Sequence, residues 1–79
     1  MARVLLFGRL SDVAGWRERE IESPSIASLR MALSAEDAGL GEALSLPGVQ
    51  VALDQEIVRG DAALTARSEV AFLPPMSGG

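Results

Sequence analysis

Two short segments near opposite ends of the chain are apolar on both of their alternating faces. The first, residues 3–7, reads Arg-Val-Leu-Leu-Phe, and the second, residues 69–73, reads Glu-Val-Ala-Phe-Leu. A strand with apolar side chains on both faces is covered on both sides, as strands of parallel pairs usually are. The two segments therefore predict adjacent parallel strands at the centre of one sheet.

Two further stretches have the period-2 pattern of strands. Residues 16–22 alternate charged side chains with Trp16 and Ile21, which predicts an amphipathic second strand. Residues 49–54 alternate valine and leucine with smaller or polar residues, which predicts a half-buried strand. A short companion strand is expected directly after it, at residues 55–58.

The middle of the chain predicts one main helix. Ile26, Leu29 and Leu33 lie at positions i, i+3 and i+7 and form one apolar stripe. Ser23-Pro24-Ser25 supplies candidates for the N-cap and the first helical position, and Gly39 is the expected stop. Shorter pieces are expected at residues 10–15, a helical or turn-like link, and at residues 40–46, a further helical turn.

The short chain restricts how these elements can be assembled. It has 79 residues, 48% of them hydrophobic, and no cysteine. This length supports one small core, which receives no help from disulfides. Strand, strand, helix, strand, strand predicts a two-layer α+β fold with a mixed sheet packed on one main helix. The best match is the ubiquitin-like β-grasp, with a domain at residues 1–75 and a flexible Gly-Gly tail at residues 76–79.

The chain lacks the residues that most enzymes use for chemistry. Histidine, cysteine, lysine and tyrosine are absent, which removes the usual general base, thiol nucleophile, Schiff-base amine and commonest metal ligands. We expect neither an autonomous enzyme nor a metal site. The net charge of −4 and the 4% aromatic content argue against nucleic acid as a ligand. No membrane span or cleavage pattern is present, so a cytoplasmic protein is expected.

Several conspicuous motifs are better explained by structure than by chemistry. Arg59-Gly60-Asp61 spells a cell-adhesion tripeptide but is expected to form a turn. Trp16, the single tryptophan, is either an interface anchor or a filler at the edge of the core. Three carboxylate pairs lack a histidine or a third ligand, so neither acid–base nor metal roles are expected for them. These pairs are Glu18/Glu20, Glu36/Asp37 and Asp54/Glu56.

The last six residues form the most distinctive motif, Pro74-Pro75-Met76-Ser77-Gly78-Gly79. Gly78 and Gly79 have no Cβ, so this end can enter a narrow channel and approach a nucleotide closely. The expected reactive group is the α-carboxylate of Gly79. Terminal glycines are also common in disordered tails and expression scars, but here they follow an apolar strand pattern without a serine-rich spacer or tag.

The segment from residue 69 to residue 79 resembles the C-terminus of one particular protein family. This family is the MoaD-type small subunit of molybdopterin synthase, a ubiquitin-like sulfur carrier whose members end in a phenylalanine-rich strand, Pro-Pro and Gly-Gly. Residues 4–10 with Ala14-Gly15, and residues 51–56 with Gly60-Asp61, are similar to the same family. The departures are Asp54 where Asn is usual, Ala66-Arg67-Ser68 where an acidic Gly-containing turn is usual, and Met76 where Val is usual.

The resemblance implies that the chain carries sulfur on Gly79. An E1-like adenylating enzyme would use ATP to form an acyl-adenylate, a sulfur donor would convert it to a thiocarboxylate, and the large synthase subunit would use it. The acceptor would be cyclic pyranopterin monophosphate, in a two-plus-two heterotetramer. The isolated chain would bind no cofactor. The residues expected to bind the partners are Phe72, Pro74 and Pro75, as an apolar docking surface, and Met76, Ser77 and Gly78, in the pocket.

Other functions share the same ending. A thiocarboxylate carrier for thiazole, cysteine or tRNA thiolation would have the same fold and the same Gly-Gly. A ubiquitin-like protein modifier would instead join Gly79 to a target lysine, although this chain has no lysine on which to build chains of itself. A third alternative is a β-grasp interaction module whose tail is inert.

Overall fold

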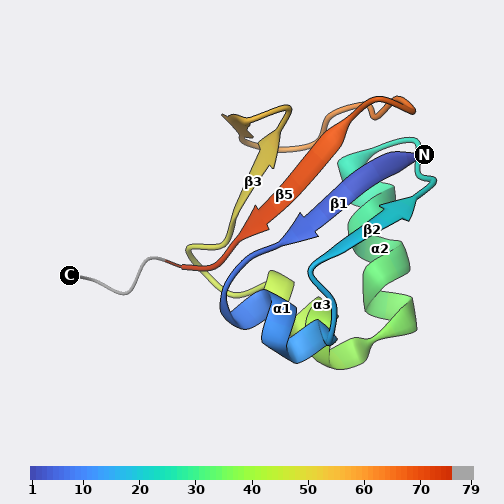
Figure 1. The fold of residues 1–79 in the computed structure, drawn as a ribbon. Helices are drawn as coiled ribbons and strands as arrows, with labels where there is room; N and C mark the ends of the chain where they lie inside the picture. Colours follow the sequence, from blue (N-terminus) through green and yellow to red (C-terminus); the bar gives the residue numbers. More distant parts are fainter. Residues whose placement is uncertain (76–79) are drawn as a thin grey trace.

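Five strands and three helices make up residues 1–75, the part of the chain that the computed structural model describes (Figure 1). The predictions made for Met76, Ser77, Gly78 and Gly79 lie outside these residues. In chain order the elements are β1 (Ala2–Leu6), α1 (Arg9–Ala14), β2 (Glu18–Ile21), α2 (Ile26–Glu36), α3 (Ala38–Leu44), β3 (Gln50–Leu53), β4 (Glu56–Val58) and β5 (Glu69–Leu73).

The predicted parallel pair lies at the centre of the sheet. β1 and β5 run parallel, and their register places Leu6 opposite Phe72. β2 pairs antiparallel with β1, β3 pairs antiparallel with β5, and β4 lies at the far edge, which gives the order β2-β1-β5-β3-β4. This mixed sheet with helices packed on one side (Figure 1) confirms the α+β, β-grasp prediction. The second strand is shorter than predicted, Glu18–Ile21 rather than residues 16–22.

The main helix, α2, begins directly after Ser25. The Ser25 hydroxyl accepts a hydrogen bond from the backbone N–H of Ser28 (3.1 Å), which makes Ser25 the N-cap. Pro24 therefore precedes the cap and does not occupy the first helical position. The Asp61 carboxylate accepts a hydrogen bond from the N–H of Ala27 (2.9 Å) and satisfies another free donor of the first turn.

No helix within residues 1–75 has the length and apolar character needed to cross a membrane.

The prediction that Gly39 stops the main helix is wrong. α2 ends at Glu36, and Asp37 is extended, with φ −145° and ψ 100°. The Asp37 carboxylate accepts a hydrogen bond from the N–H of Leu40 (3.1 Å) and so begins α3, which contains Gly39. The break occurs at Asp37 because its short carboxylate caps the new helix. The expected helical turn at residues 40–46 is therefore a helix that begins earlier, at Ala38, and ends earlier, at Leu44.

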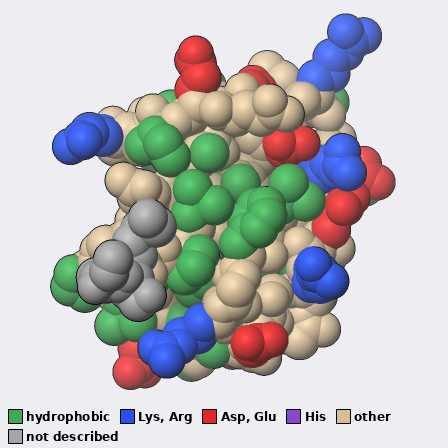
Figure 2. All heavy atoms as spheres, turned by 60° about the vertical axis from the view of Figure 1, so that its left-hand side comes forward, with side chains coloured by type: hydrophobic (Ala, Val, Ile, Leu, Met, Phe, Trp, Pro, Cys, Tyr) green, Lys and Arg blue, Asp and Glu red, His purple; other side chains and the backbone are tan. Residues whose placement is uncertain are grey.

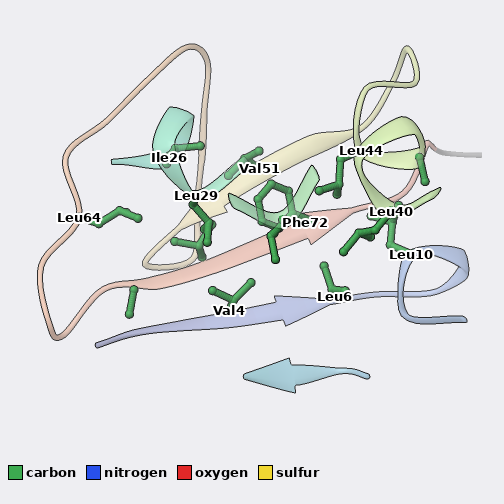
Figure 3. Close-up of a cluster of buried hydrophobic side chains, with 14 residues drawn as sticks. Val4, Leu6, Leu10, Ile26, Leu29, Leu40, Leu44, Val51, Leu64 and Phe72 are labelled. Carbon is green, nitrogen blue, oxygen red and sulfur yellow. The ribbon is translucent and has the colours of Figure 1, made fainter. Parts of the chain in front are cut away.

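One hydrophobic core fills the space between the sheet and the helices (Figure 3). Phe72 of β5 lies at its centre, with 0% of its surface exposed. Gly41 brings α3 close to α2, because a Cβ at this position would lie 2.8 Å from the Ser34 Cα. Within residues 1–75, every buried side-chain nitrogen and oxygen has a hydrogen-bond partner. The core side chains labelled around Phe72 are Val4, Leu6, Leu10, Ile26, Leu29, Leu40, Leu44, Val51 and Leu64.

Asp54 and Gln55 form the two-residue turn between β3 and β4. Both have positive φ, 50° and 71°, as the two central residues of a type I′ hairpin turn require. The Asp54 carboxylate accepts a hydrogen bond from the N–H of Glu69 (2.9 Å), and the N–H of Asp54 donates to the Glu69 carbonyl (2.8 Å). Aspartate in place of the usual asparagine is therefore compatible with a tight turn that is tied to the start of β5.

The second departure from the family pattern, residues 66–68, belongs to a compact turn. The Ser68 hydroxyl accepts a hydrogen bond from the N–H of Thr65 (2.9 Å), and the N–H of Ser68 donates to the Thr65 carbonyl (3.1 Å). The Ser68 carbonyl accepts a hydrogen bond from the N–H of Arg3 (2.9 Å). The turn thus leads directly into the pairing of β5 with β1.

Replacing Phe72 by alanine is expected to lower the free energy of unfolding by about 3–5 kcal/mol, because it leaves a cavity at the centre of the core. Urea unfolding followed by tryptophan fluorescence measures this loss. Ile57→Ala is the matched control, since Ile57 is 48% exposed on the edge strand β4, and it should change the stability by less than about 1 kcal/mol. Equal losses in the two variants would contradict the central position of Phe72.

Candidate functional site

The chain leaves the folded body directly from the central strand. β5 ends at Leu73, and Pro74 and Pro75 follow without an intervening loop. On one side the N–H of Phe7 donates to the Phe72 carbonyl (3.2 Å), and on the other side Leu73 is paired with Gln50. Neighbours on both sides therefore hold β5 as far as its last residue. The point from which the tail departs belongs to the rigid part of the fold.

The prediction that Phe72 contributes to an apolar docking surface is wrong. Its side chain points into the core and is fully buried, and the guanidinium carbon of Arg30 lies 5.7 Å from its ring centroid. Pro74 is half-buried and Pro75 is exposed, so both can still be reached by a partner. The alternation along β5 places Phe72 and Val70 on one face of the sheet. The helices cover that face.

The opposite face of the sheet carries an apolar surface that the sequence analysis missed. The strand register aligns one apolar side chain from each of four adjacent strands on this face. Side chains alternate between the two faces along a strand, so Phe7, two residues after Leu5, and Leu73, two residues after Ala71, lie on the same side. Phe7 is 45% exposed. We call this set the open-face patch. Its half-buried or exposed members are Leu5, Phe7, Ile57 and Leu73, and between them lie the small side chains of Ala52 and Ala71, which are buried.

Figure 2 shows hydrophobic side chains gathered in one area of the surface, with charged side chains around its rim. A hollow of about 640 Å³ adjoins the open-face patch at the end of β1. Leu5 and Phe7 line one part of it, and Asp12, Arg17 and Glu18 line the other. A partner that docks here would meet an apolar surface with charges of both signs at its edge. The signal for this surface was present in the sequence, because Ala71 and Leu73 alternate with Val70 and Phe72.

Four of the six carboxylates in the three pairs, Glu18, Glu36, Asp37 and Asp54, form surface ion pairs, a helix cap or a turn contact. Glu18 accepts a hydrogen bond from Arg3 (2.9 Å) and raises the pKa of that arginine. Arg19 donates to Glu36 (2.6 Å), and this hydrogen bond lowers the pKa of Glu36 below its ordinary value. Asp37 caps α3. No group of three potential metal ligands occurs within residues 1–75.

The remaining two motifs also have structural roles. Trp16 is half-buried against the core, and the guanidinium carbon of Arg19 lies 4.9 Å from its ring centroid. Trp16 therefore fills the edge of the core. In the Arg-Gly-Asp segment Gly60 has φ +90°, and the Asp61 carboxylate accepts hydrogen bonds from the N–H groups of Ala27 and Ala62 (2.9 and 2.8 Å). The segment is the expected turn.

Comparisons with known proteins agree with this geometry. The model of the ThiS family matches residues 4–79. The chain is 32% identical over 81 residues to the molybdopterin synthase sulfur carrier subunit of Escherichia coli (strain K12), with 100% of both chains covered. The small archaeal modifier protein 1 of Methanosarcina acetivorans has the same fold, with a TM-score of 0.82, 21% identity, and 99% of this chain and 95% of that chain covered.

A second similar structure is a protein–protein complex. It contains subunits 1 and 2 of the molybdopterin-converting factor of Helicobacter pylori, and a chain of it matches with a TM-score of 0.72 and 25% identity, covering 99% of this chain and 97% of that chain. The resemblance inferred from the terminal motif is thus supported over the whole length of the sequence. The chain belongs to the ThiS family, as a ubiquitin-like protein of the MoaD type.

Proposed function

We propose that this chain is the sulfur carrier subunit of a molybdopterin synthase. The observation that carries the proposal is the 32% identity to the Escherichia coli protein of that function over the full length of both chains. The structure adds a rigid departure point for the tail, because Pro74 and Pro75 continue the central strand of the sheet. The tail of this chain has the Pro-Pro and Gly-Gly that the proposed chemistry needs.

The proposed chemistry takes place on the α-carboxylate of Gly79. A carboxylate oxygen is a poor leaving group, so an E1-like partner first transfers AMP from ATP to it and releases pyrophosphate. A hydrosulfide ion supplied by the sulfur donor then attacks the acyl carbon, displaces AMP and loses its proton, which leaves a thiocarboxylate. The partners supply the base, the nucleophile and the ATP, and the isolated chain binds no cofactor. The loaded tail then donates sulfur to cyclic pyranopterin monophosphate, and two transfers complete the dithiolene.

The open-face patch is the proposed docking surface for the large subunit. It lies on the side of the sheet away from the helices and is continuous along β1 and β5 with the departure point of the tail. Pro74 and Pro75 would contact the partner at the mouth of its pocket. Met76, Ser77 and Gly78 would contact the walls of the pocket inside it. The subunit complex of Helicobacter pylori supports such an assembly. We place this chemistry in the cytoplasm, in a two-plus-two heterotetramer.

Intact mass measurement tests the proposal. After incubation with the adenylating enzyme, ATP and the sulfur donor, we expect a gain equal to the exchange of one oxygen for one sulfur, mapped to Gly79. Deletion of Gly78 and Gly79 is the control and should remove the gain. An unchanged mass with a competent enzyme would contradict the proposal, and conjugates to lysines of other proteins would favour a modifier. Loading without delivery to the pterin would indicate a carrier of another pathway.

One alanine added after Gly79 is expected to abolish sulfur loading, because it moves the carboxylate away from the position in which the adenylating enzyme holds it. Such a displacement typically costs on the order of 100-fold or more in rate. The rate of thiocarboxylate formation is measured by mass, and the thermal unfolding midpoint serves as the control for the fold. Loading at the wild-type rate would contradict the role of the terminal carboxylate.

Ile57→Asp is expected to weaken binding of the large subunit about tenfold or more, a loss of roughly 1.4 kcal/mol, because it places a charge in the open-face patch. Met31→Asp is the matched control, since Met31 is 74% exposed on α2, on the other side of the molecule from the patch. Titration calorimetry measures both affinities, and the unfolding midpoints should stay close to wild type. If both variants bound equally well, the patch would not be the docking surface.

A further inference from the structure

Two glycine turns touch the two prolines at which the chain leaves the body. A Cβ added to Gly8 would lie 3.2 Å from the Cγ of Pro74. A Cβ added to Gly48 would lie 3.0 Å from the Cβ of Pro75 and 3.5 Å from its Cα. Distances near 3 Å are shorter than ordinary contacts between carbon atoms. The absence of side chains at Gly8 and Gly48 therefore makes the space in which the two prolines lie.

Both turns are held in place by the fold. Gly8 has φ +54° and ψ −130°, and its carbonyl accepts hydrogen bonds from the N–H of Ser11 (3.1 Å) and the Ser11 hydroxyl (2.8 Å). Gly48 has φ +90°, and the N–H of Val49 donates to the Leu46 carbonyl (3.3 Å) across its turn. Positive φ values are easily adopted only by glycine. Neither turn can shift without breaking local hydrogen bonds.

The prolines themselves add little freedom at the departure point. Their rings fix φ near −65°, and the strand before them is paired on both sides. One turn comes from the connection between β1 and α1, and the other from the connection between α3 and β3. Segments far apart in the sequence thus contact successive residues of the same short exit. Such contacts hold Pro74 and Pro75 in place against the body.

We propose that Gly8 and Gly48 form a clamp on Pro74 and Pro75 that sets the direction of the tail, so that both glycines are positioning residues for the tail reaction. The expected effect of the clamp on the rate of sulfur loading rests on the proposed function. In a partner's pocket an extended tail of four residues spans about 13 Å, so an error of about 20° at the exit displaces its end by about 4–5 Å. That displacement exceeds the tolerance of a reacting carboxylate.

Gly48→Ala is the decisive variant because the chain contains a matched control. Gly48 and Gly60 both have φ +90°, but a Cβ at Gly60 would have nothing within 4 Å. Alanine therefore introduces similar backbone strain at both positions. Its methyl group collides with Pro75 only at position 48. We expect kcat/KM for sulfur loading to fall on the order of 10- to 100-fold in Gly48→Ala and less than about 2-fold in Gly60→Ala. Gly15→Ala, with φ +83° and open space, is a second control.

A double-mutant cycle separates positioning from general destabilisation. Pro75→Gly removes the Cβ and Cγ that an alanine at position 48 would meet. In the Pro75→Gly background, Gly48→Ala should therefore lower kcat/KM less than about 2-fold. Equal losses from Gly48→Ala with and without Pro75 would overturn the clamp, and so would equal losses from Gly48→Ala and Gly60→Ala.

A spectroscopic measurement tests the clamp without the reaction. The chain has no cysteine, so Met31→Cys and Ser77→Cys allow two spin labels to be attached specifically. Their distance distribution should shift or broaden in the Gly48→Ala background and remain unchanged in the Gly60→Ala background. An unchanged distribution in both variants would overturn the clamp. If the two variants differ as expected but the wild-type chain takes up no sulfur, only the proposed function is contradicted.

Discussion

The parallel pairing of β1 with β5 is the interaction on which the rest of the structure depends. It joins residues near opposite ends of the chain, so the sheet has no centre until both strands are present. The two strands are apolar on both faces, although the helices of this chain cover only one of these faces. The core on one side, the open-face patch on the other and the departure of the tail all follow from this one pair.

The alternation of side chains lets β5 serve two purposes at once. Val70 and Phe72 face the helices and hold the fold together, whereas Ala71 and Leu73 face away from them. A shift of one residue in the register would exchange the two faces. The pairing of β5 with neighbours on both sides therefore maintains the core and the open-face patch together.

The sequence predicted the central pair and offered Ser25 among the candidates for the N-cap of the main helix, because alternation and capping are local patterns. It failed at Asp37, where a side-chain cap ended the helix before the glycine signal. It also failed at Phe72, because an apolar residue type does not tell which face the helices cover. The contact of Gly48 with Pro75 joins distant segments and has no local pattern at all. What remained hidden was each feature that depends on packing between distant parts of the chain.

The late position of β5 has a consequence during synthesis. A nascent chain that stops before residue 69 lacks Phe72 and the middle of the sheet, so it has no core to close. Such a fragment exposes apolar surface and is open to proteases and chaperones. Folding therefore requires the strand from which the tail departs, and a chain truncated before β5 lacks the centre of its sheet and core.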